Sequence, residues 1–268
     1  MRSITLASLA LLAATAPLRA QQTNEDPPSL FGPQDVVFVG VSTLGTILAQ
    51  PLDRAAANRL QDSTTQTNRF LLRQSRNLEL ISTPGSFVIG GTLYAAGKLA
   101  GNERMADLGL HGTEAIVVGT LVNSIIKGLA GRARPYVDPD NSNDFSIGRG
   151  FLNEEFRSFP SGHTTAAFAA AAAVTEETRR WWPEYTWAIG IAMYGGAALG
   201  GVSRMYNNYH WASDVIMGAA IGTIAGLKVP KYHHRVNPDN GLDRALLGVS
   251  ITPAPSGNGR IVRLIVSP

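Results

Sequence analysis

Apolar segments separated by polar or helix-breaking residues recur along most of this 268-residue chain. Several of the segments are rich in Gly and Ala, and small residues allow neighbouring helix backbones to approach closely. The pattern therefore predicts an all-α fold, a compact bundle of about six core helices. The expected helices cover residues 35–49, 86–100, 106–129, 162–179, 185–202 and 210–228.

Most of the apolar runs contain polar interruptions, such as Lys98, His111 and Glu114. A helix that spans a bilayer needs about 20 predominantly apolar residues, and these runs are shorter than that. We therefore favour a soluble or peripherally membrane-associated domain, with an integral membrane protein as the alternative. The sequence does not indicate an oligomeric state.

The N-terminus has the features of a secretory signal peptide. Arg2 supplies a positive charge, residues 4–14 are apolar, and the small residue Ala20 precedes Gln21. This pattern predicts a signal peptide over residues 1–20, followed by a linker over residues 21–34, and a retained N-terminal anchor is the alternative. We expect an exported protein, located in the periplasm or another extracytoplasmic compartment.

The helical domain is expected to cover residues 35–232, with a C-terminal extension over residues 233–268. Residues 245–252 and 260–266 are apolar and β-branched, and the sequence Pro-Ser-Gly-Asn-Gly lies between them. Two such runs around a Gly-containing turn predict a β-hairpin.

Composition excludes several kinds of chemistry. The chain has no cysteine, so it has no disulfide, thiolate nucleophile or cysteine-ligated metal. Its basic residues are scattered and form no long run of like charge, which argues against a nucleic-acid-binding arm. The sequence also lacks a Gly-rich nucleotide fingerprint and a His-Glu-x-x-His motif, which argues against a nucleotide-dependent enzyme or a metallohydrolase of that type.

Three short clusters carry candidate chemistry, and the first ends an apolar helix. Lys127 and Arg134 lie seven residues apart, and Pro135 prevents further helical hydrogen bonding. If the helix persists, this spacing places both cations on one side, where a guanidinium suits phosphate oxygens. The alternative is a basic C-terminus that complements the helix dipole.

The second cluster, Pro160-Ser161-Gly162-His163, begins the next Ala-rich helix. Backbone N–H groups at a helix N-terminus favour an anion, and His163 beside that anion could act as a general acid. The alternative is that Ser161 caps the helix and His163 lies on the surface.

The third cluster contains Arg204, His210 and Asp214. A spacing of four on a helix brings Asp214 within reach of the His210 imidazole. A carboxylate that accepts from one ring nitrogen leaves the lone pair of the other free to attack, and Arg204 could meet the same anion. The alternative is an ordinary contact that stabilises the helix.

The order Lys-x6-Arg-Pro, Pro-Ser-Gly-His and Ser-Arg-x5-His-x3-Asp resembles the type 2 phosphatidic acid phosphatase (PAP2) superfamily, which includes bacterial acid phosphatases and vanadium haloperoxidases. The resemblance covers about residues 86–228, with its motifs within residues 127–214. It implies that His210 is a nucleophile that forms a phosphohistidine, that Asp214 orients it and that His163 is the general acid. It implies that the phosphate oxygens are held by Lys127, Arg134, Ser161, Gly162 and Arg204. It implies no metal or other cofactor.

By this resemblance the chain is a metal-independent acid phosphatase acting on phosphomonoesters or lipid phosphates. Candidate substrates are a lipid phosphate such as phosphatidate, a polyprenyl diphosphate or a small soluble ester, and we favour lipid phosphates. The alternatives are a haloperoxidase that holds vanadate in the same cage and a non-catalytic phosphate-binding or membrane-scaffold protein. The long segment 135–160, with Arg149, Glu154, Glu155 and Arg157, is expected to rim the pocket and select the leaving group.

Other polar residues receive structural interpretations. His233 and His234 follow the last expected helix and are expected to lie in a polar surface turn without carboxylate partners, not in a metal site. Glu114 is expected to pair with a buried cation such as Lys98.

Overall fold

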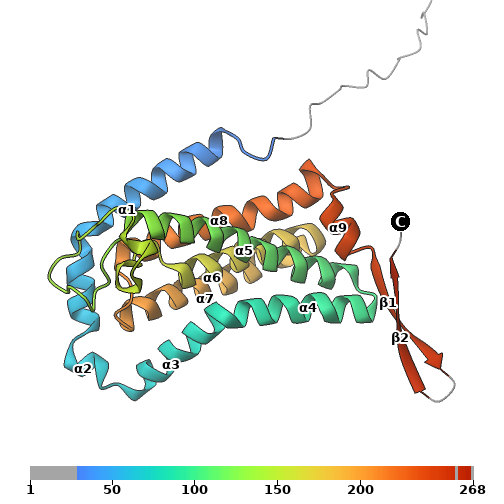
Figure 1. Cartoon of the computed structure of the whole chain (residues 1–268), viewed down its shortest axis with the longest axis horizontal. Coiled ribbons are helices and arrows are strands. Elements are labelled where there is room, and N and C mark those ends of the chain that lie inside the picture. Colours follow the sequence, from blue (N-terminus) through green and yellow to red (C-terminus); the bar gives the residue numbers. More distant parts are fainter. Residues whose placement is uncertain (1–28, 257–258, 267–268) are drawn as a thin grey trace, which may run out of the picture.

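The computed structural model describes residues 29–256 and 259–266. The predicted signal peptide and most of the predicted linker lie outside these residues. Each of the six expected segments forms a helix, which confirms the all-α expectation (Figure 1). The helices are α1 (Pro33–Leu60), α2 (Ser63–Gln66), α3 (Arg69–Leu80), α4 (Ser86–Ala100), α5 (Glu103–Ala130), α6 (Gly162–Trp181), α7 (Thr186–Tyr206), α8 (Ala212–Lys231) and α9 (Gly241–Leu246).

Helix α1 is much longer than the sequence indicated, and α2 and α3 were not expected. Pro51 lies inside α1, which continues to Leu60. The segment that forms α3 is too polar to appear as an apolar run, but Asn68 caps its N-terminus by accepting from the N–H groups of Phe70 and Leu71. Helix α3 packs against α7.

Helix α6 is the centre of the bundle, and it contacts α5, α7 and α8. Its Ala-rich sequence supplies much of a core built from small side chains. That core contains Ala115, Ile116, Ala166, Ala169, Ala173, Ala225 and Val229. Small side chains bring the helix backbones close together, so the positions of the helix ends are tightly coupled.

Three glycines spaced four residues apart on α8 face α6. A Cβ atom at Gly218, Gly222 or Gly226 would lie 2.5, 2.3 or 2.4 Å from a carbonyl oxygen of α6 or its N-cap. No side chain fits in that space, so the two backbones lie in direct contact. This contact places the start of α6 beside the second turn of α8, so both helices begin at the same end of the bundle.

The outside of the bundle is apolar. Val36 on α1 is 74% exposed and Trp187 on α7 is 72% exposed, and both have many exposed apolar neighbours. Three segments are long and apolar enough to cross a membrane, namely α1, α5 and residues Ala212–Val236. A soluble domain does not expose apolar surface on this scale. The described chain is therefore a membrane-associated protein.

The preference for a soluble or peripherally membrane-associated domain came from the polar interruptions, which shorten the apolar runs when the sequence is considered alone. In the structure α5 continues through His111 and Glu114, and His111 is completely buried among other helices. A polar side chain that points into the bundle does not shorten the apolar surface that faces outward.

The chain after α9 forms two strands. β1 (Val249–Ser256) pairs antiparallel with β2 (Gly259–Val266). The first strand begins later than residue 245, where the sequence pattern placed it, because residues up to Leu246 belong to α9. The strands lie at one end of the molecule, opposite the long segment that joins α5 to α6 (Figure 1).

We predict that Gly222→Ala lowers the free energy of unfolding by about 1–3 kcal/mol, because the added methyl group overlaps the α6 backbone. Thermal unfolding in detergent micelles measures this change. Gly195→Ala on α7 is the matched control, since a Cβ atom there meets nothing within 4 Å. Equal unfolding temperatures for the two variants would contradict the close α6 to α8 contact.

Candidate active site

A cavity of about 280 Å³ opens at the end of the bundle where α5 ends and α6 begins. All three sequence clusters contribute to its lining. The residues involved include Lys127, Arg134, Arg157, Gly162, His163, Arg204 and His210. Segments up to 83 residues apart in the chain thus meet around one space, as the motifs predicted.

Helix α5 ends before Arg134, so the predicted arrangement of the first cluster is wrong in detail. Gly131 adopts a left-handed conformation with φ of 56°, and a Cβ atom there would lie 1.9 Å from the carbonyl oxygen of Ser146. The chain therefore leaves the helix at this glycine. Lys127 reaches the cavity from the last turn of α5, whereas Arg134 reaches it from the following loop, where its Nε donates to the carbonyl oxygen of Glu154 at 3.0 Å.

His210 and Asp214 are brought together as their spacing predicted. Nδ1 of His210 lies 3.5 Å from Oδ2 of Asp214, and both side chains are buried. Asp214 also accepts from the backbone N–H of Trp211 at 2.8 Å and from Oγ of Ser158 at 2.5 Å. Since Nδ1 is the nitrogen next to the carboxylate, Nε2 is the nitrogen available to a ligand in the cavity.

Burial lowers the pKa of His210 to about 3, because desolvation penalises the charged imidazolium. The adjacent carboxylate of Asp214 raises this pKa and the positive charge of Lys127 lowers it. With a folded pKa far below its ordinary value, the imidazole is neutral at neutral pH. It therefore keeps a lone pair for attack on an electrophile.

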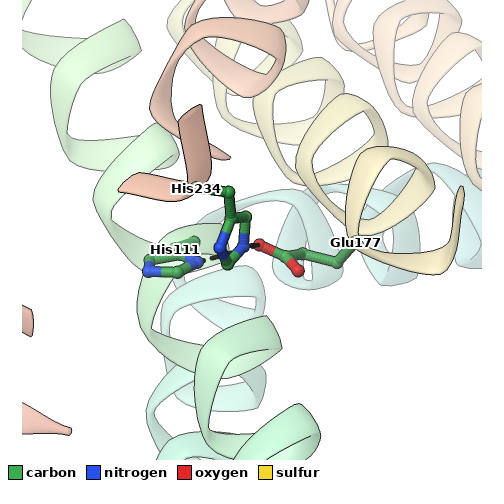
Figure 2. Close-up of side chains that lie close together, drawn as sticks. All are labelled: His111, Glu177 and His234. Atoms are coloured by element: carbon green, nitrogen blue, oxygen red, sulfur yellow. Dashed lines mark hydrogen bonds and ion pairs between the residues drawn. The ribbon is translucent and has the colours of Figure 1, made fainter. Parts of the chain in front are cut away.

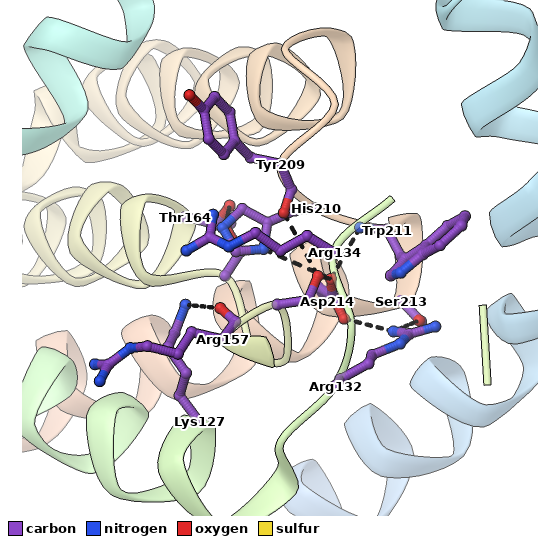
Figure 3. Close-up of polar contacts among 12 residues, drawn as sticks. Lys127, Arg132, Arg134, Arg157, Thr164, Tyr209, His210, Trp211, Ser213 and Asp214 are labelled. Atoms are coloured by element: carbon purple, nitrogen blue, oxygen red, sulfur yellow. Dashed lines mark hydrogen bonds and ion pairs between the residues drawn. The ribbon is translucent and has the colours of Figure 1, made fainter. Parts of the chain in front are cut away.

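A buried ion network lies behind Asp214, and no sequence motif indicated it. Arg132 donates to Oδ1 of Asp214 at 2.5 Å and to Oδ2 of Asp53 at 2.7 Å, and all three side chains are fully buried. Ser213 joins them, with its N–H and its hydroxyl donating to Asp53. Figure 3 shows Asp214 between Arg132 and His210. The network holds the carboxylate in place and attaches α1 to the active site.

The second cluster begins α6 as expected, but the backbone N–H of Ser161 is used in a hydrogen bond within the protein. Ser161 is completely buried, and its N–H donates to the backbone carbonyl of Asp214 at 3.0 Å. That N–H is therefore committed within the protein, whereas Gly162 and His163 line the cavity. Their N–H groups belong to the first turn of α6, where N–H groups have no carbonyl partner within the helix.

The cations of the cavity keep donors available for a ligand. Lys127 Nζ donates to the carbonyl oxygen of Arg157 at 2.8 Å, which uses one of its three protons. Arg204 Nη1 lies 2.6 Å from Oε1 of Glu79. Within the described part of the chain, Nε of Arg204 is buried and has no acceptor.

The long segment between α5 and α6 rims the cavity in part, as predicted. Glu154 and Arg157 belong to the lining. Arg149 instead stacks on the ring of Phe156, with its guanidinium carbon 3.5 Å from the ring centroid, and Glu155 is exposed. Asn123 on α5 also lines the cavity and donates to Oγ1 of Thr165, although no sequence motif indicated it.

Together these groups form a cavity suited to a tetrahedral oxyanion. Cationic side chains and a helix N-terminus provide fixed positive charge, and a neutral imidazole adjoins that charge. Such a site can stabilise the charge that develops on phosphoryl oxygens during transfer.

The interpretation of His233 and His234 as a surface turn without carboxylates is wrong. Nε2 of His233 lies 2.7 Å from Glu114, and Nε2 of His234 lies 2.7 Å from Glu177. Glu114 therefore contacts a histidine rather than Lys98, whose ammonium donates to the carbonyl oxygen of Leu247. These histidines lie at the end of the bundle opposite the cavity.

Comparison with known proteins agrees with the motifs. Residues 110–238 match the family model of the PAP2 superfamily. A 69-residue segment is 46% identical to a lipid A 1-phosphatase of Porphyromonas gingivalis, and the match covers 26% of this chain and 15% of that protein. The chain thus aligns with a small part of this relative's length.

Two solved structures are similar to this chain. One is a transmembrane PAP2 type phosphatidylglycerolphosphate phosphatase of Bacillus subtilis, with a TM-score of 0.57 and 18% identity over 74% of this chain and 94% of the other. The other is LpxE of Aquifex aeolicus, with a TM-score of 0.48 and 21% identity over 68% of this chain and 96% of the other. The Bacillus structure and this chain share a fold. The family match confirms the resemblance that the motifs indicated.

We predict that Asp53→Ala destabilises the protein by about 3–5 kcal/mol, because it removes one partner of a buried ion pair and leaves Arg132 undercompensated. Asp140→Ala is the matched control, since Asp140 pairs with Arg54 at the exposed surface and the change should leave stability almost unaltered. Unfolding temperatures of both variants in detergent test this. A stable Asp53→Ala protein would show that the network does not hold the site.

Proposed function

Since residues 110–238 belong to the PAP2 superfamily, we propose that this chain is a membrane-embedded phosphatase that hydrolyses lipid phosphates through a phosphohistidine on His210. One observation carries the proposal. A buried imidazole with Nδ1 toward Asp214 shares a cavity with His163 and with the cations Lys127 and Arg204. A protein that only bound phosphate would not need both histidines.

In the first half of the reaction, Lys127, Arg134 and Arg204 hold the phosphoryl oxygens. Nε2 of His210 attacks phosphorus, the bond from phosphorus to the leaving oxygen breaks, and His163 donates a proton to that oxygen. Burial lowers the pKa of His163 to about 4, so the negative charge of the bound phosphate must favour its protonated form. Asp214 stabilises the positive charge that develops on the imidazole. The dephosphorylated alcohol leaves and phosphohistidine remains.

In the second half, water attacks the phosphohistidine and gives a proton to His163. The bond from phosphorus to nitrogen breaks, inorganic phosphate leaves, and both histidines return to their starting states. Side chains supply the positive charge, so the mechanism needs no metal at the reacting phosphate.

Lipid phosphates fit the surroundings of the cavity better than soluble esters. The segment that contributes Glu154 and Arg157 to the lining also exposes Ile147 and Leu152, which are 93% and 88% exposed. Apolar side chains beside a charged cavity suit a substrate whose phosphate lies at the bilayer surface and whose chains lie in the bilayer. The names of the Porphyromonas and Bacillus proteins specify lipid phosphatases, which supports the same substrate class.

The three membrane-length segments support an integral membrane protein. The predicted signal peptide lies outside the described residues, so export to an extracytoplasmic compartment stays a prediction.

We predict that His210→Ala abolishes hydrolysis of phosphatidate in mixed micelles and of p-nitrophenyl phosphate, because the nucleophile is lost. His163→Ala should lose about 10²- to 10⁴-fold in kcat, the usual contribution of a general acid. Release of inorganic phosphate in the presence of EDTA measures both, and Asp140→Ala is the control. Phosphatidate should have the higher kcat/KM.

Mass spectrometry after rapid acid-free quenching should detect phosphate on His210 in the wild-type chain. Full activity in either histidine variant would contradict the assignment. Absence of hydrolysis together with bromide oxidation that requires vanadate and peroxide would show that the cavity is a haloperoxidase site instead.

A further inference from the structure

A second group of buried titratable side chains lies far from the cavity. His111 on α5, Glu177 on α6 and His234, which follows α8, point toward one another (Figure 2). Glu177 is 14 residues after His163 on the same helix, a helical rise of about 21 Å. The group therefore takes no part in the chemistry proposed for the cavity.

The geometry of this group is that of a ligand set. Nδ1 of His111 lies 2.8 Å from Oε1 of Glu177, and Nε2 of His234 lies 2.7 Å from the same oxygen. The three ligand atoms all lie within 4.8 Å of one another. His111 and Glu177 are almost fully buried, and the side chain of His234 is 14% exposed.

Hydrogen bonding within the protein leaves this group incompletely satisfied. Both imidazoles converge on Oε1 of Glu177, while Oε2 of the same carboxylate is buried and has no partner in the described residues. An unpartnered buried carboxylate oxygen is costly, so such an oxygen needs an explanation. A cation between the three side chains would supply a partner.

The surroundings of His111 favour the tautomer that a metal requires. Nε2 of His111 lies 3.4 Å from Oδ1 of Asp243. Asp243 is itself held by the side chain of Asn240 at 2.9 Å and by Nδ1 of His233 at 2.9 Å. A carboxylate that accepts from one ring nitrogen of a metal-ligating histidine is a regular feature of metal sites, and it leaves the lone pair of Nδ1 directed at the ion.

We propose that His111, Glu177 and His234 form a buried site for a divalent transition-metal ion. Two imidazole nitrogens and one carboxylate suit zinc and related ions, and the negative charge of Glu177 offsets part of the ion's charge. The ion joins α5, α6 and the segment after α8. It stabilises the end of the bundle opposite the cavity.

The test is zinc binding by the purified full-length chain in detergent, prepared without a polyhistidine tag and stripped with EDTA. Zinc returned at 100 times its Kd should bind at one ion per chain and raise the unfolding temperature by about 5–10 °C. Metal content by mass spectrometry gives the stoichiometry. Glu177→Gln and His234→Gln should lose both the bound zinc and the temperature shift.

Glu114→Gln is the matched control, because Glu114 contacts His233 in the same region but is not one of the three proposed ligands. It should bind zinc as the wild-type chain does. Cobalt in place of zinc should give visible absorption bands that Glu177→Gln abolishes. A cooperative thermal unfolding transition retained by Glu177→Gln separates loss of a ligand from loss of folding.

A wild-type chain that takes up no zinc, or a Glu177→Gln variant that takes up as much, would overturn the proposal. The readouts require no turnover, so the metal site and the phosphatase activity can fail independently. Hydrolysis at low temperature should persist after EDTA treatment even when the unfolding temperature has fallen.

Discussion

The buried carboxylate of Asp214 is the constraint on which the rest of the structure depends. A charge without water needs compensation from nearby dipoles and opposite charges, and Asp214 obtains it from Arg132, Ser158, Trp211 and the imidazole of His210. Arg132 in turn needs Asp53, which comes from α1. One buried anion thus ties together α1, the segment after α5 and the start of α8. The nucleophile is oriented by the same contacts.

The close packing of α6 and α8 makes that arrangement possible. Gly218, in the second turn of α8, lies against the carbonyl oxygen of Ser161 at the N-cap of α6, so the two helices begin at the same end of the bundle. His163 and His210, one near each helix start, consequently face the same cavity. The bundle has an apolar exterior for the membrane, and its polar groups collect in two places, the cavity at one end and the histidine–carboxylate group at the other. The side chains that contact the membrane therefore face outward, whereas the side chains that carry the chemistry face into the bundle.

The sequence predicted the helices and the main active-site residues because the relevant signals are local. Apolar runs mark helices, and the spacing of four residues indicated the contact between His210 and Asp214. Helix α8 begins at Ala212, so His210 reaches Asp214 from just before the helix. The sequence could not predict Asp53 as a partner of Arg132, because the two are 79 residues apart and no local pattern relates them. The same reason hid the group of His111, Glu177 and His234, because its members come from three segments up to 123 residues apart in the chain. Polar residues on apolar helices were taken as interruptions, and this favoured a soluble or peripherally membrane-associated domain over an integral membrane protein.

By itself, the sequence determined the helical class of the fold, the absence of cysteine chemistry and the family to which residues 110–238 belong. It did so because composition, periodicity and motif spacing are properties of short segments. The tertiary structure alone decided that Ser161 directs its N–H to Asp214, that Arg134 reaches the cavity from a loop, and that two histidines meet Glu177 at the far end of the bundle. Those outcomes depend on how closely helices distant in sequence approach one another, which is a matter of packing between small side chains rather than of any local pattern.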